Sequence, residues 1–255
     1  MINLMKAEAY KLSRNKSFWV LIVSITGFSA LLHLLIMMDW WLISGTVLNE
    51  VGLSEMNALN SFTIPLVFNL LVSTLAGFYI STEFTQSGVI KNQMMSGNKR
   101  TYIFMAKYLV FTFGSLIITL LIPLITAIIV VILFGQGEIL TLTNLMYLGR
   151  AFSLFALQFL SFTAIVLLIA IVTEDSGKTI LFTLLLSIVM FAIEKLITAP
   201  FINMLYENTI FYQFSDVFKV TMTDGEIMKS ILIGVVSLLV ILLCGMFIIN
   251  RKEIK

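Results

Sequence analysis

Long apolar runs alternate with short polar stretches along the chain. Most of the runs reach the roughly 20 residues that a helix needs to cross a lipid bilayer. They predict six membrane-spanning helices, over residues 18–38, 62–82, 103–134, 151–173, 179–193 and 230–250. The fifth run is the shortest, because Glu194 and Lys195 interrupt it, and Pro123 predicts a kink inside the third. Six spans leave both ends of the chain on one side of the membrane.

Residues 1–16 predict an amphipathic helix that lies on the membrane surface, because apolar side chains recur on one face and basic side chains on the other. The apolar face consists of Ile2, Met5, Ala9 and Leu12, and the polar face of Lys6, Tyr10, Lys11 and Arg14. A frayed, positively charged tail is the alternative.

The polar insert at residues 83–102 separates the second and third runs. Ser-Gly pairs at residues 87–88 and 96–97 break the chain on either side of four apolar residues. These four are Val89, Ile90, Met94 and Met95. A solvated linker does not need them, so the pattern favours a short helix, bracketed by two turns and docked on another surface. An ordinary loop is the alternative.

Composition agrees with the hydropathy pattern. Hydrophobic residues make up 59% of the chain and charged residues 12%, whereas soluble domains carry about 25% charged residues. The spans and their connections use almost all of the 255 residues. We therefore expect one integral membrane domain over residues 1–255, without a separate soluble domain.

The distribution of basic residues predicts the orientation. Twelve of the 16 Lys and Arg residues fall on the side that carries both termini and the insert 83–102, and four fall on the opposite side. Cytoplasmic loops are enriched in these residues. The termini and the insert are therefore predicted to be cytoplasmic, and residues 39–61 and 194–229 extracellular.

The second outer segment, residues 194–229, is rich in aromatic residues. This composition indicates short helices in or on the outer interface. A possible outer gate consists of Glu194, Lys195, Phe201, Tyr206, Phe211 and Tyr212. Lining of an outer vestibule is the simpler role for Glu194 and Lys195.

Motifs for catalysis are not found. Residues 176–179 read Ser-Gly-Lys-Thr like the end of a P-loop, but Val172 stands where that motif needs its first glycine. The chain has one histidine, His33, and one cysteine, Cys244, both inside apolar runs. We expect no catalytic residue, metal site or disulfide, a buried thiol at Cys244, and no nucleic-acid binding. A functional role for His33 stays open.

Two stretches resemble a known family. Residues 6–19, KAEAYKLSRNKSFW, are similar to the opening of small ABC-2-type transporter permeases. So is the later pattern of Glu83, Gly88-Val89-Ile90-Lys91-Asn92, Ser96-Gly97, Arg100 and Lys107. Val89 stands where the family usually has threonine, and Lys99 where serine is usual. The size and composition resemble Gram-positive permeases for lantibiotic immunity and for export of phenol-soluble modulins.

The resemblance implies an all-α integral membrane fold of six transmembrane helices. Residues 1–16 would form a connecting helix, with Met5, Ala9 and Leu12 on its docking face. Residues 83–102 would form a cytoplasmic coupling helix between spans 2 and 3. The residues implied in coupling are Glu83, Phe84, Gly88, Val89, Ile90, Lys91, Met94, Met95, Gly97 and Arg100.

The resemblance also implies partners. Such a permease binds no cofactor itself, because ATP and Mg²⁺ belong to a separate nucleotide-binding ATPase subunit. A second permease, identical or different, would complete the transport path in the cell membrane. The implied function is ATP-driven export of amphipathic peptides, such as a toxin or an antimicrobial peptide, or of lipid-like molecules. A sensor or immunity scaffold of the same fold is the alternative, and a membrane-embedded enzyme is a third possibility.

Overall fold

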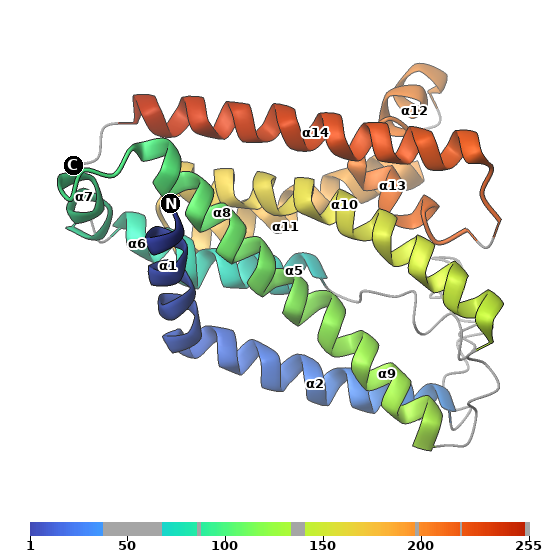
Figure 1. Cartoon of the computed structure of the whole chain (residues 1–255). Coiled ribbons are helices and arrows are strands. Elements are labelled where there is room, and N and C mark those ends of the chain that lie inside the picture. Colours follow the sequence, from blue (N-terminus) through green and yellow to red (C-terminus); the bar gives the residue numbers. More distant parts are fainter. Residues whose placement is uncertain (38–67, 86–87, 134–140, 197–198, 220, 253–255) are drawn as a thin grey trace.

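The computed structural model describes residues 1–37, 68–85, 88–133, 141–196, 199–219 and 221–252, and within these ranges it contains helices and no strand. Long helices run side by side between two ends of the molecule (Figure 1). We call the end with the N-terminus and the last turn of α14 the basal end. The opposite end, with α12 and α13, is the distal end. The prediction of an all-α membrane protein is confirmed.

Within the described ranges the elements are helices, in this order along the chain. They are α1 (Ile2–Arg14), α2 (Lys16–Met37), α5 (Phe68–Leu75), the π-helix η1 (Ala76–Ser81), α6 (Thr82–Thr85), α7 (Gly88–Met95), α8 (Arg100–Leu116), the π-helix η2 (Ile117–Leu121), α9 (Ile122–Leu133), α10 (Leu142–Thr173), α11 (Ser176–Leu196), α12 (Pro200–Tyr206), α13 (Ile210–Asp216) and α14 (Asp224–Arg251).

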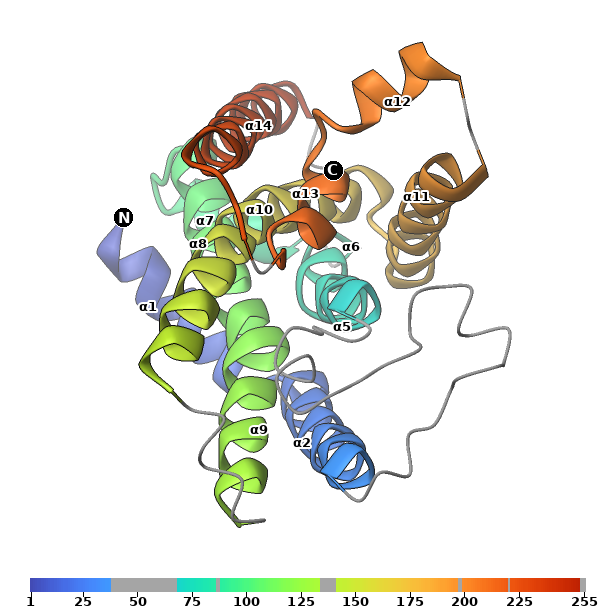
Figure 2. The ribbon, with the colours of Figure 1, turned by 90° about the vertical axis from the view of Figure 1, so that its right-hand side faces the viewer.

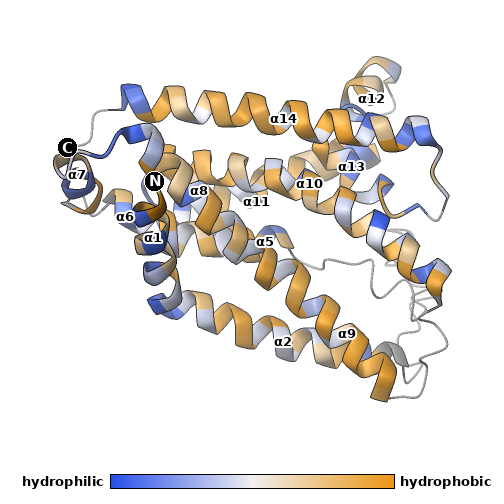
Figure 3. Cartoon of the chain, viewed as in Figure 1, coloured by the Kyte–Doolittle hydropathy of each residue, from blue (hydrophilic) through white to orange (hydrophobic). Residues whose placement is uncertain are grey.

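Five helical stretches of the described chain are long and apolar enough to cross a membrane. They are Lys16–Leu35, Arg100–Leu133, Leu142–Thr173, Ser176–Glu194 and Asp224–Arg251. Each coincides with one of the six predicted runs. The remaining run, residues 62–82, begins outside the described residues and continues into α5 and η1. Hydrophobic residues occupy the middle of the bundle and hydrophilic residues gather at its two ends (Figure 3).

The fourth span begins earlier than the predicted residue 151. Its helix starts at Leu142, where the Thr141 hydroxyl accepts a hydrogen bond from the Asn144 amide as an N-cap. The prediction stopped at the charge of Arg150. In the structure Arg150 is part of the helix, and its guanidinium donates to the carbonyl of Lys219 at the distal end. A charge that finds a polar partner at a membrane edge need not end a span.

The sequence predicted a kink at Pro123, and the structure has a π-helical segment just before this residue. η2 ends two residues before the proline, which lacks an N–H and crowds the carbonyl four residues earlier. The wider π turn accommodates this loss, as π-bulges in long helices commonly do.

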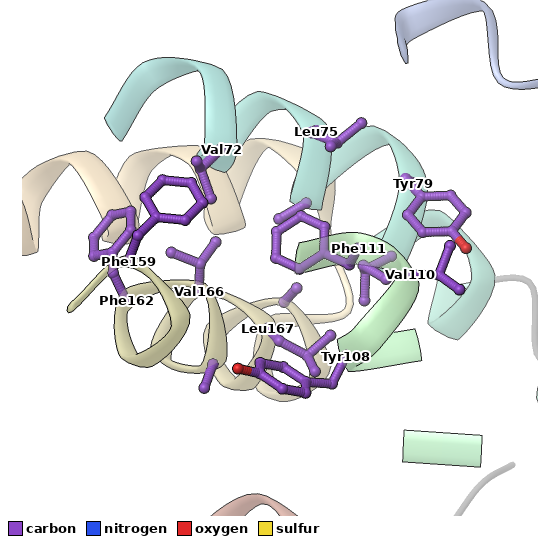
Figure 4. Close-up of a cluster of buried hydrophobic side chains, with 14 of the residues drawn as sticks. Val72, Leu75, Tyr79, Tyr108, Val110, Phe111, Phe159, Phe162, Val166 and Leu167 are labelled. Carbon is purple, nitrogen blue, oxygen red and sulfur yellow. The ribbon is translucent and has the colours of Figure 1, made fainter. Parts of the chain in front are cut away.

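α10 is the central helix. In its most apolar window 61% of the residues are buried, against 11% for α11 and for α14. Its buried face presents a row of aromatic and aliphatic side chains to α5, η1 and α8 (Figure 4). The row includes Phe155, Phe159, Phe162, Val166 and Leu167. α11 and α14 therefore flank a core that α10 organises.

Two glycines bring α14 close to the core. A Cβ on Gly245 would lie 2.4 Å from the ring of Phe104, and one on Gly234 would lie 2.7 Å from Leu157. Small residues are the usual means by which membrane helices approach closely. Cys244, next to Gly245, is exposed, so the prediction of a buried thiol is wrong. The reason is that α14 packs through its glycine face and leaves the thiol on another face.

Candidate functional site

Four charged side chains meet at the basal end, and we call them the basal charge cluster: Glu8 and Lys11 of α1, Glu83 of α6 and Lys107 of α8. The Lys107 ammonium lies 3.0 Å from Glu8 Oε2 and also pairs with Glu83 Oε2. The Lys11 ammonium lies 2.9 Å from Glu8 Oε1 and 3.0 Å from Glu83 Oε1. Each lysine therefore bridges both carboxylates, and the four groups form a closed, neutral ring.

The Glu8 carboxylate also receives hydrogen bonds from two further elements. The hydroxyl of Tyr79, in η1, donates to Glu8 Oε2 at 2.9 Å and to the Glu8 carbonyl at 3.1 Å. The side-chain amide of Gln93, in α7, donates to Glu8 Oε1 at 2.9 Å. One carboxylate thus holds α1, η1, α7 and α8 together.

The cluster is largely buried, although the Lys11 side chain is 31% exposed. The Glu8 and Lys107 side chains are 1% and 0% exposed, and that of Glu83 is 13% exposed. Burial by itself raises the pKa of Glu8, but Lys107, Lys11 and the Gln93 amide lower it to about 2. Burial lowers the pKa of Lys11, and the two carboxylates outweigh this and raise it. Glu8 and Lys11 therefore both stay ionised at neutral pH.

The spacing of residues on α1 explains how Glu8 becomes buried. Leu4, Glu8 and Leu12 are four residues apart, so they share one helical face, and all three are buried. Leu4 packs on Ile103 and Ala106 of α8, one turn before Lys107. At the other end Leu12 approaches Gly114, where an added Cβ would lie 2.6 Å from the leucine methyl. The absence of a side chain at Gly114 lets α1 lie against α8.

The predicted apolar face of residues 1–16 is found beside this buried face. Ile2, Met5, Ala9 and Leu12 all line one surface groove between α1 and α8. Leu12 is buried, Met5 is half-buried, and Ile2 and Ala9 are exposed. The prediction missed Glu8, the single acidic residue of a basic helix. Its position four residues from two leucines is the signal that could have indicated it.

The insert forms the short helix α7, and its C-terminal turn contains Gly97 in the left-handed region, at φ +82°. Ile90 is 1% exposed, and Met94 packs on the α1–α8 contact. These two side chains attach α7 to its own chain. The expectation that Ile90 docks on another protein is therefore wrong, because the core buries it.

The outer face of α7 is polar except at one position. Lys91 and Asn92 are exposed, Val89 is half-buried, and Met95 is 74% exposed. Of the four apolar residues of the insert, Met95 is the one that projects furthest from the protein.

Arg100 and Phe84, both expected at a coupling surface, belong instead to a second network. The Arg100 guanidinium donates to the carbonyls of Asn250 and Lys252, at 3.0 and 2.6 Å, where α14 ends. The Lys252 ammonium pairs with Glu174 at 2.7 Å, donates to the Ile171 carbonyl and lies 5.6 Å from the centre of the buried Phe84 ring. We call Phe84, Arg100, Glu174 and Lys252 the basal clasp. It connects α6, α8 and the ends of α10 and α14.

The predicted outer-gate residues do not form one group in the structure. The Tyr206 hydroxyl donates to Glu194 at 2.9 Å, and the rings of Tyr206 and Tyr212 meet edge to face at 5.9 Å. Burial and the Glu194 carboxylate raise the pKa of Tyr206. Phe211 instead joins the aromatic core through Phe162. Phe201 is exposed. The side chain of Lys195 lies outside the described residues.

The two other candidate groups, His33 and residues 176–179, are not part of a catalytic arrangement among the described residues. His33 is buried, and its Nδ1 lies 2.6 Å from the Ser29 carbonyl. The P-loop-like segment forms the corner between α10 and α11, where the Ser176 hydroxyl donates to the Gly77 carbonyl of η1 at 2.8 Å. Among the described residues no group of three or more His, Cys, Asp or Glu could hold a metal ion.

Five apolar helical stretches define a multi-pass membrane protein. The surface helix α1 and the insert helix α7 are held together at one charged end of it. Over residues 4–193, from α1 to α11, the chain matches the sequence model of the family described as ABC-2 family transporter protein. The chain belongs to this family and is a membrane-spanning permease component of an ABC transporter. Permeases of the family usually work with a separate ATP-binding subunit. Comparisons with curated proteins and with solved structures gave no match.

Proposed function

We propose that this permease exports amphipathic peptides and that its basal end receives the conformational change of a separate ATPase. The basal charge cluster carries this proposal. The surface helix α1, which is distant in the sequence from the other three elements, meets η1, the insert helix α7 and α8 at one buried, ionised group, Glu8. A movement of α1 or α7 would therefore reach the spans through α8 and η1.

The basal end faces the cytoplasm in this proposal. Support comes from the twelve basic residues on the side of the termini and the insert, since cytoplasmic segments are enriched in Lys and Arg. Trp19 places this corner at a membrane interface, on whichever side, because its indole N–H donates to the Ser13 carbonyl at 2.7 Å between α1 and α2. Tryptophan at such a corner is typical of the membrane interface.

The outer face of α7 is the proposed docking surface for the ATPase, which would hold ATP and Mg²⁺. Met95 supplies the exposed apolar contact and Lys91 a charge beside it. Gln93 lies on the same helix and donates to Glu8. A shift of α7 would therefore be felt directly by the charge cluster. A second permease, identical or different, would complete the path.

The peptide substrate is proposed from the character of the span surfaces. A hollow of about 530 Å³ lies between α10 and α11 and is open to the surface. It is lined by Leu168, Ile169, Val172, Thr173, Phe182, Leu185, Leu186 and Val189. Thr173 is the one polar residue in this lining. An amphipathic or lipid-like molecule suits such a surface better than a sugar or an amino acid does, because a buried polar group without a partner is unfavourable.

The docking surface is tested with Met95→Asp. The permease is co-expressed with a candidate ATPase subunit of an ABC transporter and purified from membranes. A charge in an apolar contact is unfavourable by several kcal/mol, so the variant is expected to lose the ATPase. Met228→Asp, at another exposed methionine (58%, against 74% for Met95) near the distal start of α14, is the control and should retain it. Equal retention by both variants would remove the docking role of α7.

The substrate is tested with the reconstituted complex. ATP hydrolysis is measured with amphipathic peptides and, separately, with sugars and amino acids. Stimulation by peptides, together with their movement into the vesicle compartment opposite the ATPase, supports export. Stimulation by the polar solutes alone contradicts it. Peptide binding without hydrolysis or movement would favour the alternative, a sensor or immunity scaffold.

A further inference from the structure

The groove between α1 and α8 has the features of a lipid site. It has a volume of about 690 Å³ and is open to the surface of the protein. Its α1 wall is lined by Ile2, Met5, Lys6, Ala9, Leu12 and Ser13. Its α8 wall is lined by Leu109, Val110 and Phe113 and continues to Ile117, with Phe18 of α2 at the corner. Lys6 is the only charged residue among these lining residues.

The two walls are continuous stripes. Leu109 and Phe113 of α8 and Ile117 at the start of η2 are four residues apart, so they form one row that runs about 12 Å along the helix. Phe113 is 64% exposed, so its ring is accessible along this row. α1 lies alongside α8 at the basal end (Figures 1 and 2). The groove therefore leads from a surface helix along a helix that enters the membrane.

The charge at the mouth of the groove is positive. The charge cluster contains two acidic and two basic groups and neutralises Lys11 and Glu8 within itself. Lys6, Arg14 and Lys16 remain on the exposed side of this corner, and none of them forms an ion pair with another described residue. An apolar row that begins at a cation matches a molecule with an apolar chain and a negative head.

We propose that the groove binds one anionic phospholipid. Its phosphate contacts the Lys6 ammonium, and an acyl chain lies on Leu109, Phe113 and Ile117. This assignment rests on the proposed orientation of the basal end towards the cytoplasm, where anionic lipids concentrate. A lipid in this position touches both α1 and α8. It therefore stabilises the docked position of α1, and with it the charge cluster, by mass action.

The test measures lipid binding to the purified permease by native mass spectrometry. Phosphatidylglycerol and phosphatidylcholine with identical acyl chains are titrated separately. Phosphatidylglycerol is expected to bind more tightly. Lys6→Ala should weaken its binding about five-fold, the effect of one lysine near an anionic surface, and leave phosphatidylcholine unchanged. Ala9→Trp, which fills the groove at an exposed position, should weaken both lipids. Lys178→Ala is the control, because Lys178 is exposed at the basal end outside the groove, and it should bind as the native chain does.

Two results would overturn the proposal. Equal binding of the two lipids would mean that the groove is a general apolar surface. An equal loss in Lys6→Ala and Lys178→Ala would mean that only the overall charge attracts the lipid. A third result would reassign the groove: if Ala9→Trp dissociates a permease dimer and lipid binding persists, a second copy of the chain covers it. None of these measurements needs the ATPase, so they can fail independently of the coupling experiment.

Discussion

Replacement of Glu8 by Gln is the sharpest test of the basal charge cluster. The change keeps the size of the side chain and removes its charge. Lys107, 0% exposed, would then keep Glu83 as its single acidic partner, and the neutral ring would become positive. Loss of one partner from a buried ion pair typically costs about 3–5 kcal/mol. That is a large fraction of the roughly 5–15 kcal/mol by which a domain is stable.

Glu8→Gln should release α1 from the bundle before it unfolds the whole protein. Glu8 attaches α1 to η1, α7 and α8, so the docked position of α1 is the equilibrium that changes. A cost of about 3–5 kcal/mol corresponds to an opening equilibrium that rises by roughly 10²- to 5 × 10³-fold, at about 1.4 kcal/mol per factor of ten. Hydrogen exchange of the α1 amides, measured by mass spectrometry in detergent, should accelerate by this factor, while the amides of α10 stay protected.

A double mutant separates charge from shape. Lys107→Met in the Glu8→Gln background removes the excess positive charge and leaves Glu83 and Lys11 as a pair. The double variant should be more stable than the sum of the single changes predicts, by about 1–3 kcal/mol. Glu207→Gln, at an exposed distal residue, is the control and should change nothing. Additive single changes, or normal exchange of α1 in Glu8→Gln, would refute the view that the cluster holds the basal end.

Three further predictions concern other parts of the molecule. Folding lowers the pKa of Glu8 from 4.5 to about 2. The stability that the ionised carboxylate contributes is therefore complete above the unfolded pKa and is lost as the pH falls towards 2. The stability difference between the native chain and Glu8→Gln should be constant at about pH 6–8 and shrink below 4.5. Arg100→Gln removes charged hydrogen bonds, worth roughly 1.5–3 kcal/mol, from the end of α14, and hydrogen exchange of the last α14 turn should increase while that of its middle stays unchanged. Gly245→Leu overlaps a core ring and should cost about 1–3 kcal/mol or more, seen as a lower unfolding temperature, whereas Gly149→Leu, with no atom within 4 Å of the added Cβ, should unfold like the native chain.

Hydropathy predicted the membrane helices well, because a run without charges has few alternatives to a span. It failed at Arg150, where the boundary depends on a partner that lies far away in the sequence. That guanidinium donates to the carbonyl of Lys219, and this carbonyl becomes available only after the distal end has folded. The start of a span is therefore set partly by tertiary contacts and not by hydropathy alone.

The candidate site was predicted in outline and its chemistry was not. The existence of a helix within the insert followed from its apolar residues and its Ser-Gly breakers. Which of those residues point inward depends on the position of α1 and α8, so Ile90 was assigned to the wrong surface. Lys107 was noticed as a motif residue. A lysine in an apolar run requires an acidic partner. Glu8 lies 99 residues away in the sequence, so spacing could not identify the partner.

The single turn of α6 gives a physical reason to treat the two basal networks as one device. Glu83 enters the charge cluster, with α1 and α8, and the next residue, Phe84, packs under Lys252 in the basal clasp. Adjacent residues on a helix point about 100° apart, so one turn can reach both sides. α6 also continues directly from η1, a π-helical segment of a kind that is often found at functional sites. Displacement of α6 would therefore disturb α1 and α8 on one side and the ends of α10 and α14 on the other. A movement that arrives at α7, three residues further along the chain, therefore has a route to α1, α8, α10 and α14.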